Sequence, residues 1–556
     1  MADGVVGLWR SALKKCGERE AVVALAIALP LGALVLRLCF GKIPRSRRRG
    51  RSMSFGSGYM SIGAWPRDVK MSDPIITAFL FLDGVPQKAS LEEACSKILR
   101  FQNFRSLPVR RAWCYSTRFE WREIEVRPSD VITWAKAEGS AAVVAEMDRV
   151  KDDSFRQQTV DGRDLPMWGL HVIENTGKEE GGVGTVAALR IHHTLGDGMS
   201  IVAVGRSVLE ASASGGREMG GPGGDTSAAD AVVKLDSRRV SNFSARQILR
   251  GIGDVIALSA AGPDTPLPFG HFEAPISGGG AKASHRTFEG GLFSPKRGAF
   301  SERRRTVLLP DIPLALVKKL KGASSTTVND VIMALVVGCI RRYSEANGAT
   351  ADSFGGSRPG FKSRALIPVA LPRPASSSGA ILCNKWGFAS MSMSIDEADP
   401  VVRLQKLKAT TAGIKTSPTA GLQYLMQTHV LPLLPLWACR EMVHGALATH
   451  TVTVSNVPGP QEPVKFAGVG LRKNHFAFSN ITPQVGAVSL DGKIAINFVV
   501  DPVSIPESLT LTAHFLDELE GLAGGLGVSI ISEMSDLRAH ASELVRVMDA
   551  ALIVPS

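Results

Sequence analysis

Two adjacent histidines, followed closely by an aspartate and a glycine, form the pattern in this chain with the clearest chemical potential. The stretch is Arg190-Ile-His192-His193-Thr-Leu-Gly-Asp197-Gly198. A neutral imidazole can take a proton from a hydroxyl group near pH 7, which is the task of a general base. Successive side chains of a strand point to opposite faces, so only one of the two histidines can face a given cleft. We interpret His193 as the general base.

The residues on either side of this pattern predict a strand, a turn and a helix. Small and β-branched residues over 185–189 are typical of a buried strand, and the apolar spacing of 199–209 predicts a helix. Asp197 could orient the imidazole, hold the turn, or cap the helix. Gly198 would permit close packing or a positive φ. From these residues alone, two packed histidines with a capping aspartate are as plausible as a catalytic His193.

Other common chemistries lack their sequence patterns. The seven cysteines are scattered without a CxxC pair, and no Cys/His cluster has zinc spacing. There is no HExxH, no GxSxG, no Walker A motif and no GxGxxG after a predicted strand. We therefore expect no metal ion, no covalent protein nucleophile and no cofactor. A histidine base without a nucleophile favours direct transfer, in which a substrate hydroxyl attacks a bound acyl donor.

Length and charge limit the classes of protein that this chain can belong to. A chain of 556 residues is too long for one compact core and predicts two domains or lobes. The net charge is +12, but residues 1–51 hold eleven Lys or Arg and three acidic residues, and so account for eight of these charges. Charge gathered beside an apolar segment favours a membrane surface over nucleic acid as the partner. Scattered cysteines favour free thiols in a reducing compartment.

The N-terminal 51 residues are predicted to be a membrane anchor with basic flanks. Residues 21–40 are apolar except for Arg37, and about 20 such residues can cross a bilayer. The more basic flank follows this segment, at 42–51, so the positive-inside rule places the body of the protein in the cytosol. A cleaved signal peptide and an organelle transit sequence are the alternatives. We expect a single-pass protein of the endoplasmic reticulum membrane.

The remaining chain is expected to form two lobes of α/β class, because strands and helices mix without regular βαβ alternation. Residues 52–72, rich in Gly and Ser, are typical of a linker. The predicted units that follow are an N-terminal lobe, a flexible Gly/Ser-rich linker, a C-terminal lobe and a terminal helix, at 72–210, 211–230, 231–530 and 531–556.

The histidine pattern resembles the HHxxxDG motif of the CoA-dependent acyltransferase superfamily. The chain as a whole is most similar to the bifunctional wax ester synthase/acyl-CoA:diacylglycerol acyltransferase family. Pro166-Met167-Trp168 resembles the family's PLW segment, Asn329-Asp330 before an apolar helix resembles its ND motif, and Asn384-Lys-Trp-Gly387 resembles its Asn-x-x-Gly turn. Further similarity lies in Ser455–Pro460, in the predicted hairpin over 485–501 and in the helix around 515–519.

This resemblance implies a fold and a reaction. The fold would be two chloramphenicol-acetyltransferase-like lobes with a tunnel between them. The reaction would be transfer of a long-chain acyl group from acyl-CoA, a substrate and not a cofactor, to a fatty alcohol or to diacylglycerol. His193 would be the base, and His192, Asp197 and Gly198 would shape its loop. Asn329 and Asp330 would support the site from the second lobe, and membrane lipid would be a further partner.

Two other functions stay open at this point. One is a condensation-type enzyme that uses carrier-protein thioesters, although no carrier segment is visible in the sequence. The other is a membrane-tethered lipid-binding protein without activity, against which the intact His193 and Asp197 argue. The sequence does not indicate the preferred acceptor, the acyl chain length, protein partners or the oligomeric state.

Overall fold

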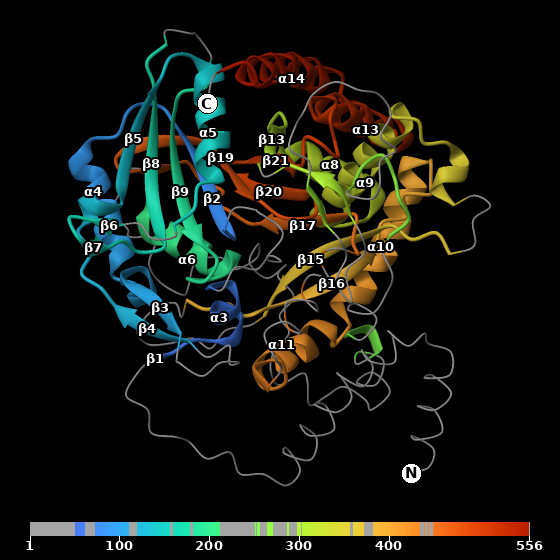
Figure 1. Ribbon diagram of the computed structural model, residues 1–556. Coiled ribbons are helices and arrows are strands. Elements are labelled where there is room, and N and C mark those ends of the chain that lie inside the picture. The colour runs from blue at the N-terminus through green and yellow to red at the C-terminus, as the bar shows by residue number, and fades with distance from the viewer. Residues whose placement is uncertain are drawn as a thin grey trace, which may run out of the picture.

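The computed structural model shows two large β-sheets side by side with helices around them (Figure 1). The structure describes the following residues: 51–61, 73–110, 119–155, 159–177, 182–211, 251, 253–255, 264–270, 286–288, 297–301, 303–355, 360–371, 382–433, 439, 443, 447 and 449–554. The apolar segment 21–40 of the predicted anchor lies outside these residues, and so does the predicted linker over 211–230 apart from its first residue, Ala211.

The first sheet carries the histidine pattern on one of its inner strands. Its seven strands run in the order β10-β18-β19-β2-β9-β8-β5. Strand β9 is buried along its whole length and pairs antiparallel with both β2 and β8. The bounds are β2 Ile75–Leu82, β5 Ile132–Ala137, β8 Trp168–Asn175, β9 Thr185–His192, β10 Leu209–Ala211, β18 Val464–Phe466 and β19 Val469–Phe478.

Two strands of the first sheet come from the C-terminal part of the chain. Strand β19 pairs with β2, with Phe478 opposite Ile76, and β18 pairs with β10. The linear division into 72–210 and 231–530 therefore does not describe the sheets, because residues 464–478 leave the second half and complete the first. This crossing places the ends of β19 and β9 at the same edge of the sheet, on either side of the start of β2.

The second sheet is built from the C-terminal half alone. Its path is β13-β21-β20-β17-β15-β16, and β14 pairs with β21 beside β13. Asp491 and Gly492, both at positive φ, join β20 to β21, which confirms the predicted Asp-Gly hairpin. The bounds are β13 Arg305–Leu308, β14 Ile312–Pro313, β15 Arg364–Ala370, β16 Trp386–Ser392, β17 Val452–Val457, β20 Gln484–Leu490 and β21 Lys493–Val500.

Helices cover both faces of the first sheet. Apolar residues of α4 (Lys88–Leu99) and α6 (Gly198–Val208) pack on one face, and α5 (Ser140–Lys151) packs on the other. The core on the α5 side continues without a break into the second half. One apolar core therefore joins the two sheets.

The helices of the second half surround α9, which is buried along most of its length. The apolar helix predicted after Asn329-Asp330 is thus confirmed. The bounds are α8 Leu314–Ser324, α9 Val328–Ala346, α10 Pro400–Lys415, α11 Thr419–His429, α13 Leu511–Gly525 and α14 Ile531–Ala551.

One local prediction is wrong. The predicted linker over 52–72 contains a buried helix, α3 (Phe55–Ser61), which follows the short strand β1 (Arg51–Ser52). Strand β1 pairs with β4 (Phe119–Glu123), which in turn pairs with β3 (Ser106–Arg110).

The smaller elements of the described chain complete the fold. Two short hairpins are β6 Thr159–Val160 with β7 Arg163–Asp164, and β11 Arg286–Phe288 with β12 Arg297–Phe300. Single 3₁₀ turns occupy Gln102–Arg105, Pro128–Val131, Ala351–Phe354, Leu431–Leu433 and Ser508–Thr510.

Within the described residues, no single helix has the length and apolar composition needed to cross a bilayer. Only α8 and α9 taken together meet that requirement, and they are bent by 96° to each other.

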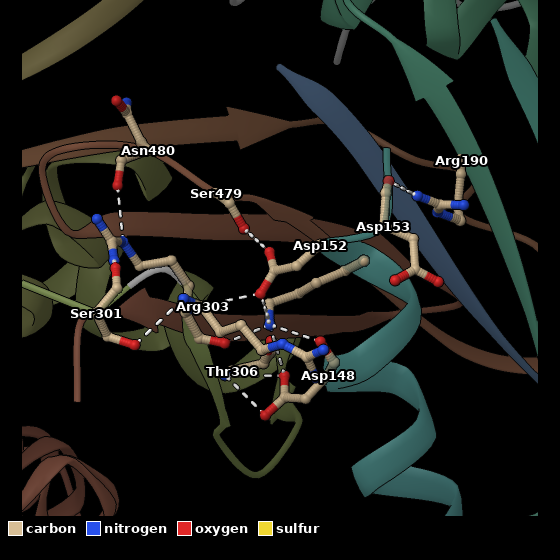
Figure 2. A network of polar contacts seen from close by, with 11 residues as sticks. Asp148, Asp152, Asp153, Arg190, Ser301, Arg303, Thr306, Ser479 and Asn480 are labelled. Atoms are coloured by element: carbon tan, nitrogen blue, oxygen red, sulfur yellow. Dashed lines mark hydrogen bonds and ion pairs between the residues drawn. The ribbon is translucent and has the colours of Figure 1, made fainter. Parts of the chain in front are cut away.

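A buried network of polar contacts ties the first half to the second (Figure 2). At its centre the Lys151 ammonium lies 3.0 Å from Asp148 Oδ1 and 3.2 Å from Asp152 Oδ2, and it donates to the carbonyl of Arg304. Asp152 also accepts from the Ser479 hydroxyl at 2.5 Å. Burial lowers the pKa of Lys151, but the two carboxylates more than offset this and raise it above its usual value, so the lysine is charged.

Replacement of Lys151 by Met should destabilise the protein strongly. Loss of one partner leaves the buried carboxylates of Asp148 and Asp152 uncompensated, which costs about 3–5 kcal/mol. The measurement is the melting temperature of the purified protein, which should fall by several degrees. The control is Lys406→Met, because Lys406 makes a similar 2.8 Å ion pair with Glu397 but its side chain is 46% exposed, against 1% for Lys151. Equal melting temperatures for the two variants would contradict the prediction.

Candidate active site

The histidine pattern forms the turn that joins β9 to α6, as the sequence predicts. Strand β9 ends at His192, and α6 begins at Gly198 with Asp197 as its N-cap. The backbone N–H of His193 donates to the carbonyl of Pro74 at 2.8 Å, which fixes the turn to the start of β2. A strand end anchored in this way holds the next side chain in one place.

The two histidines have different surroundings. His192 is 1% exposed, and its Nδ1 accepts from the N–H of Thr194 at 3.1 Å, so its ring is used in folding the turn. His193 is only partly buried. This difference agrees with the interpretation of His192 as a packed residue that shapes the loop.

Aromatic rings from the two halves of the molecule flank the imidazole of His193. The ring of Trp386, at the start of β16, has its centroid 6.4 Å away, and that of Phe478, at the end of β19, lies 5.7 Å away. Both meet the imidazole edge to face, at 70° and 72°. Nδ1 of His193 is buried without a hydrogen-bond partner in the described part of the chain. The imidazole of His193 therefore lies in apolar surroundings where the two sheets meet.

These surroundings keep His193 neutral. Burial lowers its pKa below the usual 6.5, although the charge of Asp197, the residue's own carbonyl and the amide of Asn384 act in the opposite direction. Only the neutral ring can accept a proton. The site thus favours the form that a general base requires.

Asp197 holds the turn through hydrogen bonds to both sides of the junction. One carboxylate oxygen accepts from the N–H of Ser200 at 3.1 Å, as a helix cap does. The other accepts from the N–H of Lys385 at 2.9 Å, on the far side of the junction. Of the three roles open to Asp197 from the sequence, the geometry supports capping and holding.

Residues 383–385, which lie just before β16 in the second half, form hydrogen bonds with this turn. We name them the clasp segment. Asn384 donates its amide to the carbonyl of His193 at 2.6 Å. Cys383 and Ser200 exchange hydrogen bonds, with the Ser200 hydroxyl 3.1 Å from the Cys383 carbonyl and 3.2 Å from its N–H. With the bond from Lys385, the clasp segment fixes both ends of the turn.

The glycine that the turn requires is Gly196 and not Gly198. Gly198 has no positive φ, and a Cβ added there would meet open space. A Cβ on Gly196 would lie 2.4 Å from the Cβ of Ser200. The close packing expected at Gly198 is therefore wrong by two positions, since the tight approach occurs where the turn folds back on α6.

Asn329 and Asp330 lie at the start of α9, where they support the second half. The Asp330 carboxylate forms a capping box with Thr327 and accepts from the hydroxyl of Thr411, which ties α9 to α10. The side-chain oxygen Oδ1 of Asn329 accepts a hydrogen bond from the side-chain amide of Asn456 on β17. Among the described residues no hydrogen bond, ion pair or ring contact joins either side chain to His193, so any support for the site is indirect.

Sequence reasoning did not assign several residues that surround the base. Asn384 was recognised only as part of a turn motif, and Trp386 and Phe478 carry no local signal that brings them to His193. Within the described residues, no group of three or more His, Cys, Asp or Glu side chains could hold a metal ion.

The arrangement of the two sheets is found in other solved structures. A wax ester synthase/diacylglycerol acyltransferase from Marinobacter aquaeolei VT8 matches 86% of this chain and all of its own, with a TM-score of 0.52 and 15% identity. The first condensation domain of the calcium-dependent antibiotic synthetase matches 86% of this chain and 96% of its own, with a TM-score of 0.50 and 14% identity. The chain therefore has the mixed α/β fold that these two groups of proteins share.

Sequence comparisons match the first of these two groups, the wax ester synthase/diacylglycerol acyltransferases. Residues 382–523, which begin beside the clasp segment, match the WS/DGAT C-terminal domain. The Mycobacterium tuberculosis protein that carries the name diacylglycerol O-acyltransferase Tgs4 is 28% identical over 328 residues, which are 57% of this chain and 64% of that protein. Wax ester synthase/diacylglycerol acyltransferase 5 of Arabidopsis thaliana is 26% identical over 64% of this chain and 71% of its own length. Residues 382–523 thus carry a WS/DGAT C-terminal domain, and the chain is similar to proteins named as wax ester synthases and diacylglycerol acyltransferases, the family that its motifs resemble.

The pH dependence of activity should show the lowered pKa of His193. Protonation on the acid side removes the base, so kcat/KM should fall to half at a pH below 6.5, the usual imidazole value, and stay at its plateau near neutral pH. The measurement is kcat/KM for acyl transfer from acidic to neutral pH, with circular dichroism to confirm that the protein stays folded. A half-maximal pH at or above 6.5 would contradict the prediction.

Proposed function

We propose that this protein is an O-acyltransferase that moves a long-chain acyl group from acyl-CoA to a fatty alcohol or to diacylglycerol. The observation that carries the proposal is a neutral, partly buried His193 held between aromatic rings where the two halves meet. The names of its relatives as wax ester synthases and diacylglycerol acyltransferases support the same class of reaction. Because the chain covers only 64% of the length of Tgs4, the activity of that protein is not simply carried over.

The proposed mechanism is direct transfer without an acyl-enzyme. The hydroxyl of the acceptor donates to an imidazole nitrogen of His193, which takes its proton as the oxygen attacks the thioester carbonyl. The tetrahedral intermediate then collapses, its carbon–sulfur bond breaks, and the departing sulfur receives the proton from His193 as free CoA forms. The base returns to its neutral state, so no net change remains on the protein. Asp197 takes no proton in this scheme, since its two oxygens bind backbone N–H groups.

We further propose that the two sheets correspond to chloramphenicol-acetyltransferase-like lobes and that a tunnel between them passes His193. Support comes from the position of the base, which is held on one side by β9 and β19 and on the other by the clasp segment. Two substrates that enter from opposite ends of such a passage would meet at the imidazole. Excess water at this point would hydrolyse the thioester, and the apolar rings of Trp386 and Phe478 would limit its access.

We also propose that the N-terminal segment attaches the protein to a membrane, with its catalytic body in the cytosol. The motivation is the apolar run at 21–40 with its basic flank. Long-chain alcohols and diacylglycerol partition into bilayers, so an enzyme that uses them benefits from residence at the lipid surface.

Replacement of His193 by Ala should abolish acyl transfer. Loss of a general base lowers kcat by roughly a hundredfold or more. The assay supplies purified protein with radiolabelled palmitoyl-CoA and a mixture of hexadecanol and diacylglycerol, and separates the products by thin-layer chromatography. The control is His540→Ala, since His540 is exposed on α14. Activity of His193→Ala above a tenth of wild type would rule out His193 as the base, and acyl-CoA binding without turnover in the wild type would favour a non-catalytic lipid-binding protein.

Replacement of Trp386 by Leu should change the choice of acceptor. The indole flanks the base from the second half, and a smaller side chain widens the approach for the bulkier diacylglycerol. Because each methylene in an apolar pocket changes discrimination by about tenfold or more, the ratio of triacylglycerol to wax ester should rise by at least that factor. Trp134→Leu is the matched control, because Trp134 lies on edge strand β5 and is 40% exposed. An unchanged product ratio in Trp386→Leu would show that Trp386 does not select the acceptor.

A further inference from the structure

We propose that helix α3 completes the catalytic site and that Ser57 within it is a positioning residue for His193. The proposal rests on the function given above, in which His193 is the base. Ser57 has no contact with the imidazole in the described structure and would act through Asn384 and the turn. Residues of this kind alter the reaction by fixing the geometry of the reacting group.

Helix α3 is a buried part of the junction between the two halves. Ser57 and Tyr59 are each 3% exposed and Met60 is 7% exposed. The segment is fixed from its N-terminal side, because the N–H of Met53 donates to the carbonyl of Phe119 at 3.0 Å and β1 pairs with β4. A segment that served only as a flexible linker would not be buried this deeply, so this Gly- and Ser-rich stretch has a structural role.

Ser57 binds both sides of the junction. Its carbonyl accepts from the hydroxyl of Thr194, the residue after the base, at 2.7 Å. Its own hydroxyl oxygen accepts from the amide nitrogen of Asn384, in the clasp segment, at 2.9 Å. The helix is therefore a third component of the site, beside the turn and the clasp segment.

The side-chain amide of Asn384 transmits this contact to the base. Its nitrogen has two hydrogens, and its two shortest contacts are to the Ser57 hydroxyl and to the carbonyl of His193, at 2.9 Å and 2.6 Å. Its oxygen accepts from the indole N–H of Trp386 at 3.3 Å. Removal of the Ser57 hydroxyl takes away the 2.9 Å partner of one amide hydrogen and leaves it only the Thr194 carbonyl at 3.5 Å, so the amide is held less firmly and can shift. Such a shift would disturb both the backbone of His193 and the ring beside its imidazole.

Close packing of the same helix reinforces this arrangement. A Cβ added to Gly56 would lie 3.1 Å from the Cβ of Asn384, which is tighter than ordinary van der Waals contact. Gly56→Ala would therefore displace Asn384 by a few tenths of an ångström while it keeps the Ser57 hydroxyl. The two substitutions disturb the same amide by different means.

The test compares Ser57→Ala with Ser61→Ala in the full chain. Ser61 lies in the same helix and donates only to the carbonyl of Gly58, at 2.7 Å, so it is a matched control. For Ser57→Ala we expect kcat to fall about three- to tenfold, which is the effect of one hydrogen bond, with KM for acyl-CoA within twofold of wild type. Ser61→Ala should match wild type in both constants. Equal kcat values for the two variants, each corrected for folded protein by its melting curve, would overturn the proposal.

Gly56→Ala decides the question if Ser57→Ala does not fold. It should show the same fall in kcat with little change in KM, and an unchanged kcat would overturn the proposal. A double replacement, Ser57→Ala with Asn384→Ala, adds a check, because residues that act through one another have non-additive effects. Losses in kcat that simply multiply would also count against a shared path.

A readout that does not depend on activity separates this proposal from the proposed function. With carbon-13 in the histidine rings, the nuclear magnetic resonance signal of His193 is identified by its absence in His193→Ala. The titration midpoint of this signal should shift in Ser57→Ala and stay in place in Ser61→Ala. A wild-type protein without transferase activity would overturn the proposed function, whereas an unmoved midpoint in Ser57→Ala would overturn the role of Ser57.

Discussion

The carboxylate of Asp197, shared between the two halves of the molecule, is the interaction on which the site depends. One oxygen starts α6 and the other accepts from the backbone of Lys385, so a single side chain defines both the turn and its distance from the second sheet. The charge of Asp197 raises the pKa of His193, while burial of the imidazole lowers it more. The same residue therefore shapes the turn and moderates the electrostatics around His193.

The junction is held at several places, and each uses a different kind of contact. The clasp segment binds the turn through hydrogen bonds between side chains and backbone groups, the rings of Trp386 and Phe478 flank the imidazole, and the buried charges around Lys151 join the ends of α5 and β19 (Figure 2). Ser479, which binds Asp152 in this network, directly follows Phe478. The position of the Phe478 ring beside His193 is thus linked to the ion network around Lys151. Together these contacts hold a site between two sheets as rigidly as a site at the end of a single sheet would be held.

Local patterns in the sequence predicted the elements that local interactions form. The strand, turn and helix around His193, the Asp491-Gly492 hairpin and the buried helix α9 follow from periodicity and turn chemistry, and the HHxxxDG pattern indicated the family. The crossing of β19 into the first sheet was not predictable, because pairing between β2 and β19, which are about 390 residues apart, leaves no local trace. Helix α3 was missed because its Gly and Ser content is typical of linkers. For Asn329 and Asp330 the local prediction was correct, since α9 begins there. Their contacts described above lie within the second half, however, so the sequence pattern did not show how they relate to His193.

The late addition of β19 to the first sheet has a consequence for synthesis of the chain on the ribosome. Strands β2 and β9 leave the ribosome early, but the edge of β2 stays without its partner until residues 469–478 have emerged. At about 5–20 residues per second, the intervening stretch takes on the order of tens of seconds to translate. During this time the nascent chain presents Ile-Ile-Thr-Ala-Phe-Leu-Phe-Leu as an open, apolar edge that can pair with other chains. A chain that ends before β19 keeps this edge open, and we expect such a truncated protein to aggregate more readily than the full chain.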